Sequence, residues 1–163
     1  MPRQFIVAEL APERIDQALP VVQTLDPGLD AEGWRAIART FASANGDRGI
    51  LAMLTGAGHI RGLLCFEVRD YEGERILAVS RLIATGLMDA TTTAQGLVEA
   101  AEMTARHHAC PIAEIDLATL AMPREIERRA ILAALAAQGY CSTGQRLTHR
   151  LDPADRGRAA GQA

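Results

Sequence analysis

The sequence has few aromatic residues and no long apolar run. One Trp, two Tyr and three Phe make up 4% of the 163 residues. The core must therefore be built from Leu, Ile, Val and Ala, which favours helices packed closely on a sheet. A helix that crosses a bilayer needs an apolar run of about 18 or more residues, and none is present. We therefore expect a globular protein with no membrane partner.

Cysteine is too sparse for a disulfide framework. Cys65, Cys110 and Cys141 are odd in number and widely spaced, and no secretory signal is present. We expect three buried thiols and a cytoplasmic protein. The neighbouring His107 and His108 resemble metal ligands beside Cys110, but adjacent helical side chains point about 100° apart. No second ligand pair follows, so we expect no metal.

An excess of basic charge is also missing. The chain has 17 basic and 20 acidic side chains, which gives a net charge of −3. No positive field is available to attract a phosphate backbone, so we expect no nucleic-acid partner. An apolar fraction of 48% with 23% charged residues is typical of an ordered domain, and the length suits a single one.

The N-terminal part predicts a strand followed by two helices. Residues 4–9 are apolar enough for a short strand. The apolar spacing that follows indicates a helix, which Pro20 should bend or divide. Asp30 is a good N-cap for the second helix, and Leu29 before it can contact Trp34 across the first turn.

Residues 49–85 predict an antiparallel meander of three strands. Residues 49–55 and 75–84 are strongly apolar, as central strands are. The segment between them alternates apolar and mixed side chains, so one face of the middle strand should be apolar and the other mixed. Glu67 lies on the mixed face.

The chain then predicts a crossover. From Asp89 the apolar period becomes helical, and residues 112–118 again indicate a strand. A strand, a helix and a strand in this order imply a right-handed parallel crossover. Residues 124–138 predict a last helix that ends at Gly139. From Ala130 onward it is apolar nearly all round, so we expect it to be deeply buried.

A closing strand is expected over residues 142–151. Its exposed edge would permit a homodimer. Residues 152–163 are polar and predict a disordered tail. We therefore expect one domain over residues 1–151.

This order of elements resembles that of the GNAT superfamily of N-acetyltransferases over residues 4–151. The segment GLVEAA at 96–101 is similar to the helix after the family's pyrophosphate loop, and AALAAQGY at 133–140 is similar to its fourth helix. The resemblance implies a three-layer α/β fold with a mostly antiparallel sheet and one parallel crossover. It also implies transfer of an acetyl group from acetyl-coenzyme A (acetyl-CoA) to a small-molecule or peptide amine.

The family's pyrophosphate loop has the pattern R/Q-x-x-G-x-G/A, and this chain departs from it. The pattern places Asp89 at the Arg/Gln position, Thr92 at the first Gly and Ala94 at the second. Asp89 either faces the pyrophosphate or caps its own helix. By resemblance, residues Thr91, Thr92, Thr93 and Ala94 are the candidates for binding the pyrophosphate through hydroxyl and amide groups.

A second cofactor contact is implied by the family's last meander strand. There the strand separates from its neighbour and exposes main-chain groups that hold the pantetheine of the coenzyme. The resemblance assigns this role to Leu82, Ile83 and Ala84. The alternative is an ordinary buried strand, and the sequence does not separate the two.

The catalytic groups of the family are only partly matched. Many members use a Tyr on the fourth helix to protonate the leaving thiolate, and that position here is Leu135. Tyr140 matches a packed aromatic of the family, so we expect a core residue. Glu67 is the candidate general base, because it lies on the mixed face beside the expected substrate cleft. It could instead pair with a cation or face water.

Two functions therefore remain open at this point. The resemblance implies an acetyl-CoA-dependent N-acetyltransferase. The departures at Asp89, Thr92 and Leu135 allow a catalytically degenerate member that serves as a binding or regulatory domain.

Overall fold

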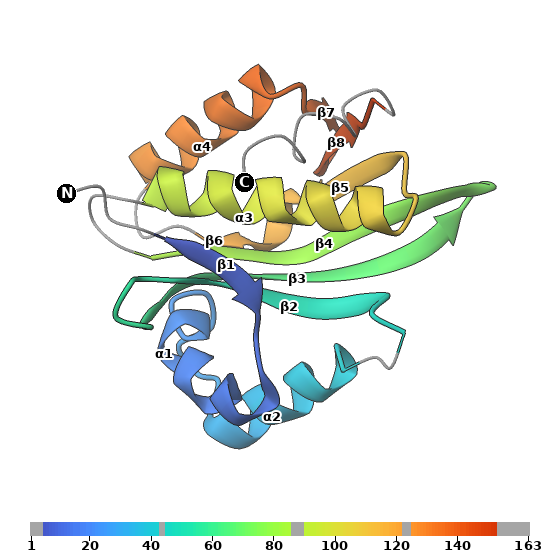
Figure 1. Cartoon of the computed structure of the whole chain (residues 1–163). Helices are drawn as coiled ribbons and strands as arrows, with labels where there is room; N and C mark the ends of the chain where they lie inside the picture. The colour runs from blue at the N-terminus through green and yellow to red at the C-terminus, as the bar shows by residue number, and fades with distance from the viewer. Residues whose placement is uncertain (1–4, 43–44, 86–89, 122–124, 153–163) are drawn as a thin grey trace.

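The computed structural model describes residues 5–42, 45–85, 90–121 and 125–152. Within them, eight strands form one sheet in the order β1-β2-β3-β4-β5-β8-β7, with β6 beside β4. Helices α1 and α2 cover one face of the sheet, and α3 and α4 cover the other (Figure 1). The three-layer α/β architecture is therefore confirmed. The elements are β1 Ile6–Glu9, the 3-10 helix η1 Pro12–Ala18, α1 Leu19–Val22, α2 Ala31–Thr40, β2 Arg48–Leu54, β3 Ile60–Tyr71, β4 Glu74–Ala84, α3 Ala90–His107, β5 Ile112–Asp116, the 3-10 helix η2 Leu117–Thr119, β6 Leu120–Ala121, α4 Glu125–Ala137, β7 Cys141–Thr143 and β8 Arg146–Arg150.

The N-terminal helices follow the sequence signals. The helix around Pro20 is divided, because η1 gives way to α1 at the residue before this proline. Asp30 caps α2 as predicted: its Oδ1 accepts a hydrogen bond from the amide of Gly33 at 2.7 Å. Trp34 is fully buried, and its Nε1 donates to the carbonyl of Ile15 at 2.7 Å. These contacts hold α2 and η1 together on one face of the sheet.

The central meander is confirmed, but its mixed face is more buried than predicted. Strands β2, β3 and β4 pair in antiparallel order. Leu63 and Cys65, on the face expected to be mixed, are fully buried under α1 and α2. After Arg61 at the start of the strand, that face carries no charged side chain until Glu67. A single strand therefore crosses from a helix-covered core to an open charged surface.

The parallel crossover is confirmed too. Strand β4 precedes α3 in the chain and β5 follows it, and these two strands pair in parallel. The predicted strand over residues 112–118 is shorter than expected. Asp116 ends it, since its Oδ1 accepts a hydrogen bond from the amide of Ala118 at 2.9 Å and starts η2. This local turn competes with the sheet ladder. The chain then returns to β4 as β6.

Two predictions for the C-terminal part are wrong. Helix α4 buries only one side: Ile131 and Leu135 are fully buried, whereas Ala133 is exposed. Alanine is apolar but small, so an Ala-rich helix can face water on one side. The closing strand is in fact two strands, β7 and β8, joined by a turn at Gly144, which has a φ of +65°. Of the predicted tail over 152–163, residues 153–163 lie outside the described residues.

The end of α4 is as predicted. Gly139 has a φ of +103°, which a glycine adopts without the steric cost that a Cβ would add. The amide of Tyr140 then donates to the carbonyl of Leu135 at 3.0 Å. These features close the helix and direct the chain back to the sheet.

Because Cys65 is buried, we expect the folded protein to become less stable at alkaline pH. Burial raises the pKa of the Cys65 thiol to about 12, from 9.0 in an exposed cysteine. The unfolded chain therefore loses this proton first as the pH rises, so stability is full below pH 9 and falls between pH 9 and 12. We expect the free energy of unfolding to fall by about 1 kcal/mol more between pH 7.5 and 9.5 in the wild type than in Cys65→Ala.

Urea titrations at the two pH values measure this difference. Cys141→Ala, which removes an exposed thiol, is the matched control and should keep the wild-type pH dependence. An equal loss of stability in the wild type and in Cys65→Ala would contradict the prediction.

Candidate functional site

Strand β4 has an open stretch on the side of β5. It pairs with β5 over residues 76–79 and with β6 at Leu82 and Ile83. Ser80 and Arg81 lie between these pairings, and no described strand pairs with them on that side. On this side the main chain at Ser80 and Arg81 is therefore not held in a strand ladder, because β5 has ended and η2 follows it.

A β-bulge occurs at the same place. Cys65 on β3 lies opposite Arg81, while the next residue, Phe66, lies opposite Val79. Ser80 is therefore the extra residue of β4. The Oγ of Ser80 is buried without a hydrogen-bond partner among the described residues. A buried hydroxyl without a partner costs free energy, so this stretch is more consistent with a site than with a structural strand.

The open stretch lies two residues before its predicted position. Leu82 and Ile83 pair with β6, and their side chains are fully buried, as in the alternative of an ordinary strand. Ala84 is the last residue of β4 and is also buried. The open stretch itself carries a sequence signal, because Ser80-Arg81 is a polar pair inside an apolar strand.

The first turn of α3 lies against the end of β4, because a Cβ at Gly62 of β3 would meet both Thr93 and the carbonyl oxygen of Ile83. The helix begins at Ala90, so the amides of Thr91 and Thr92 precede the first residue that can donate within the helix. Thr92 is exposed, whereas Thr93 is fully buried, with an Oγ1 that has no partner among the described residues. A bound anion can accept hydrogen bonds from the amides of Thr91 and Thr92.

Two other residues of the predicted loop behave differently. Ala94 is fully buried in the core, and its amide lies four residues into the helix, where it is placed to donate to the carbonyl of Ala90. Its predicted contact with a pyrophosphate therefore does not fit this geometry. Asp89 lies outside the described residues.

Glu67 lies on the open charged face of the sheet. It is opposite Ala78 of β4, one residue before the end of the β4–β5 pairing. Its Oε2 is 3.9 Å from Nε of Arg48, and 37% of its side chain is exposed. An exposed pair at this separation is weak, so the carboxylate remains available to another cation.

Glu114 of β5 is the other carboxylate beside Ala78, and sequence analysis did not single it out. Its Oε1 lies 2.7 Å from Arg69 and 3.4 Å from Arg146, and only 14% of its side chain is exposed. Two guanidinium groups already contact this carboxylate, and it is more buried than that of Glu67. It is therefore less open than Glu67 to a substrate amine.

Tyr140 is a core residue, as predicted. Only 4% of it is exposed, and burial, followed by the nearby charge of Glu102, raises the pKa of its hydroxyl well above the usual value. Glu102 also lies 3.2 Å from Nδ1 of His149. Leu135, where the family has its acid, is fully buried. Neither residue can supply a proton to a substrate.

The cysteines are only partly as predicted, since Cys65 and Cys110 are buried but Cys141 is exposed. Within the described ranges, no three His, Cys, Asp or Glu side chains gather as a metal site. In the same part of the chain, no helix combines the length and the apolar character needed to cross a membrane.

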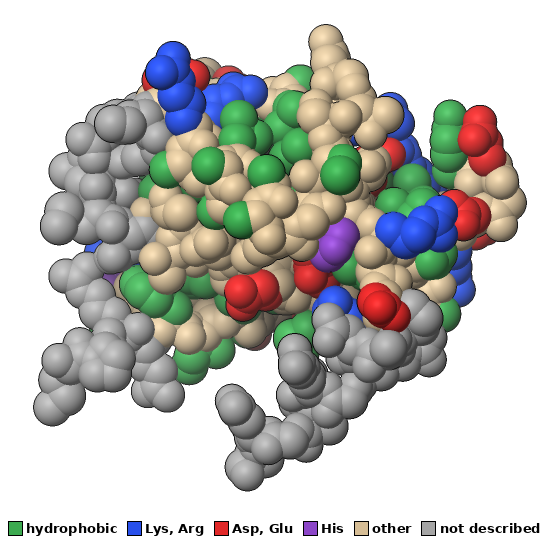
Figure 2. All heavy atoms as spheres, turned by 90° about the horizontal axis from the view of Figure 1, so that it is seen from above, with side chains coloured by type: hydrophobic (Ala, Val, Ile, Leu, Met, Phe, Trp, Pro, Cys, Tyr) green, Lys and Arg blue, Asp and Glu red, His purple; other side chains and the backbone are tan. Residues whose placement is uncertain are grey.

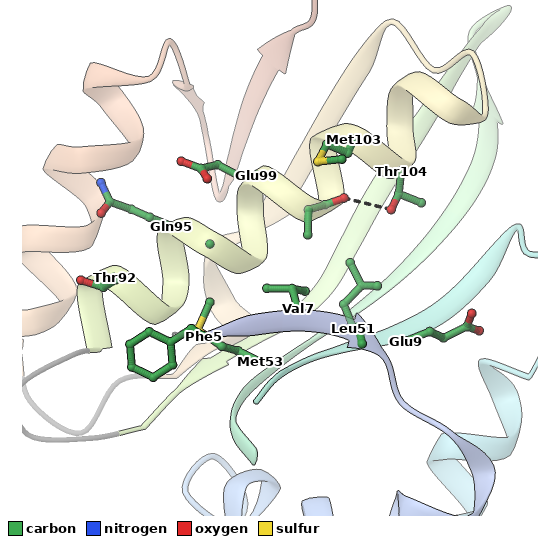
Figure 3. Close-up of a pocket in the computed structure, with 13 residues that line it drawn as sticks. Phe5, Val7, Glu9, Leu51, Met53, Thr92, Gln95, Glu99, Met103 and Thr104 are labelled. Carbon is green, nitrogen blue, oxygen red and sulfur yellow. Dashed lines mark hydrogen bonds between the residues drawn. The ribbon is translucent and has the colours of Figure 1, made fainter. Parts of the chain in front are cut away.

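A groove of about 710 Å³ lies on the other side of α3, and sequence analysis did not predict it. Figure 3 shows Val7, Leu51 and Met53 at its base and α3 along its upper side. Thr92, at the start of α3, lines one end of it. This volume lies in the range of small-molecule sites.

Comparisons with protein-family models and with curated proteins give no match. Solved structures do match. A GCN5-related N-acetyltransferase from Kribbella flavida has a TM-score of 0.71 at 10% identity over 90% of this chain and 98% of that one. Aminoglycoside N-acetyltransferase AAC(6')-Iy in complex with CoA has a TM-score of 0.68 at 13% identity, over 88% and 92%.

A third match is to part of a larger protein. It is a fungal multi-domain β-N-acetylglucosaminidase with a GCN5-related glucosamine N-acetyltransferase region, with a TM-score of 0.66 at 13% identity. It covers 86% of this chain but 17% of that protein. These likenesses agree with the sheet order, the parallel crossover and the helix layers described above. The chain has the fold of the GNAT superfamily of N-acetyltransferases.

Proposed function

We propose that the chain transfers an acetyl group from acetyl-CoA to an amine. The observation that carries the proposal is the open stretch of β4 at Ser80 and Arg81, in a fold shared with CoA-bound N-acetyltransferases. Main-chain groups at this stretch can hold the amides of the pantetheine arm, and the buried Oγ of Ser80 would gain a partner there.

The first turn of α3 supplies the second half of the cofactor site. The amides of Thr91 and Thr92, together with the positive end of the helix dipole, suit a pyrophosphate. The hydroxyl of Thr93 is close by and has no partner among the described residues. Threonine in place of glycine keeps these amides and adds bulk, so we expect binding that is weaker than a glycine loop would give.

Glu67 is the proposed general base. When bound, the coenzyme supplies a thioester whose carbonyl is open to attack by an amine. An ammonium acceptor must first lose a proton, and Glu67 can take it directly or through a water molecule. Its position opposite Ala78 places it beside the open stretch of β4, and among the described residues it pairs only with Arg48, at 3.9 Å.

Calorimetric titration of CoA tests the cofactor site. We expect saturable binding by the wild type and by Thr92→Gln, and binding about tenfold weaker by Thr92→Glu, because the new carboxylate repels the pyrophosphate. The same change should leave the melting temperature unchanged or slightly raised, since acidic residues are favourable at a helix N-terminus. No heat at millimolar CoA, or equal affinity of Thr92→Glu, would contradict the proposal.

Release of free thiol from acetyl-CoA with a panel of amines tests the transfer. The chain contains no lysine, so none of its own side-chain amines competes as an acceptor. Turnover that depends on the added amine supports an N-acetyltransferase. CoA binding without thiol release for any amine would instead support the catalytically inactive binding domain that Leu135 allows.

A further inference from the structure

Strand β1 leaves one edge of the sheet free. Among the described strands it pairs only with β2. The amide of Leu10, which follows β1, donates to the carbonyl of Ile50 at 2.8 Å. Since antiparallel strands turn alternate residues toward their partner, Val7 and Glu9 direct their amides and carbonyls outward. No described residue forms a hydrogen bond with these outward amides and carbonyls.

The groove beside α3 lies directly next to this edge. Its base is formed by Val7 of β1 with Leu51 and Met53 of β2, and α3 forms its wall. Gly96 of α3 lies against this base, and a Cβ there would collide with Cε of Met53. Glycine inside a helix lowers its stability, so its place here reflects the close approach of helix and sheet. The outward main chain and the apolar base thus belong to the same surface.

The rim of the groove is acidic. Glu9 and Glu99 both line it and are exposed, and neither has a basic partner among the described residues. In Figure 3, Glu9 lies at the far end of β1 and Glu99 lies on the helix above the base. Figure 2, which views the helical side, shows hydrophobic side chains spread over this face together with acidic ones.

Exposed hydrophobic residues flank the same edge. Only three large hydrophobic side chains are exposed in the described part of the chain, and two of them are Ile6 and Met103, at 53% and 59%. Ile6 lies on β1 and alternates with the groove residue Val7, whereas Met103 lines the groove. Exposed apolar groups beside a polar rim are typical of a binding surface.

We propose that β1 and this groove bind an extended peptide segment with apolar side chains in its middle and basic side chains at its ends, which adds a strand to the free edge of the sheet. Pairing with Val7 would supply main-chain hydrogen bonds. Side chains on one face of the added strand would enter the groove, where apolar groups meet Met53 and basic groups meet Glu9 and Glu99. The opposite face would cover Ile6. This binding does not depend on acetyl transfer.

A second copy of the chain fits this edge less well. Self-pairing through β1 would add the Glu9 and Glu99 of a second copy, and the groove lining of that copy offers no basic side chain to pair with either rim. Both acidic rims would stay without a cationic partner at an apolar interface, which is unfavourable. A basic peptide satisfies the same groups. Charge therefore selects the peptide over the homodimer at this edge.

The test uses a capped fluorescent peptide, Arg-Val-Leu-Thr-Leu-Val-Arg, titrated into the full chain and followed by anisotropy. We expect saturable binding with a Kd on the order of 100 μM that weakens with added salt. The double variant Glu9→Gln and Glu99→Gln should bind roughly fivefold more weakly. The matched control Glu13→Gln, an exposed carboxylate in η1, should bind as the wild type does.

Two further changes separate strand addition from simple groove binding. N-methylation of the two leucines of the peptide removes amide donors without altering the protein, and we expect binding to be lost. Val7→Pro removes an outward amide that takes no part in the β1–β2 ladder, and it should have the same effect.

Three results would overturn the proposal. The first is no saturation at 1 mM peptide, a concentration of about ten times the expected Kd. The second is equal binding of the N-methylated peptide. The third is a dimer in light scattering that Val7→Pro dissociates, because the edge would then belong to a second copy of the chain.

Discussion

Gly62→Ala is expected to lower the free energy of unfolding by about 3 kcal/mol, because it overpacks the contact between β3 and α3. A Cβ at Gly62 would lie 2.5 Å from Cγ2 of Thr93 and 2.8 Å from the carbonyl oxygen of Ile83. The second contact is to main chain and cannot be relieved by a side-chain rotation. The first turn of α3 must then move away from the sheet, so CoA affinity should fall as well.

Urea unfolding measures this change, with Gly28→Ala as the matched control. A Cβ at Gly28 meets nothing closer than 3.6 Å, and its φ is not positive. The control should therefore change stability by less than about 0.5 kcal/mol. A similarly small effect at Gly62 would show that the close approach of β3, β4 and α3 is not as described.

Glu67→Gln is expected to lower kcat/KM for acetyl transfer by about 100-fold if the proposed base is correct. Glutamine keeps the shape of the side chain but cannot accept the proton of the ammonium. The lost pair with Arg48 is exposed, so stability should hardly change. The affinity for CoA, measured by calorimetry, should also stay the same, because the carboxylate acts on the amine.

Glu74→Gln is the control for this prediction. Glu74 pairs with Arg150 on the exposed part of the sheet, with Oε2 at 3.0 Å from the guanidinium, and no role in transfer is proposed for it. It should retain wild-type turnover. If kcat/KM falls by less than about threefold in Glu67→Gln, this residue is not the base. A water molecule would then be the next candidate for the proton acceptor.

Local signals in the sequence were enough for most of the fold. Pro20 and Gly139 interrupt helices for steric reasons, and Asp30 caps one through its own side chain. These effects act within a few residues, so the sequence carries them directly. The meander and the crossover follow from changes in apolar period, which also act locally.

The candidate site depends on pairings that are distant in the sequence. The open stretch at Ser80 exists because β5 ends at Asp116 and the chain returns as β6. Both events occur more than 30 residues later in the chain. No apolar period inside β4 reports them, and the resemblance assigns the pantetheine contact to Leu82, Ile83 and Ala84 instead. The groove at β1 also depends on segments that are distant in the sequence, because it lies between the first strand and α3.

Amide chemical shifts recorded during a titration with CoA test the central claim most directly. We assume that CoA binds between the first turn of α3 and the open stretch of β4. The amide resonances of Thr91, Thr92, Ser80 and Arg81 should then shift at the lowest CoA concentrations, and their shifts should saturate at the same concentration. The amide resonances of Val7 and Glu9 on the free edge of β1 should not shift. Saturating shifts confined to the edge, or none at either place, would contradict the account.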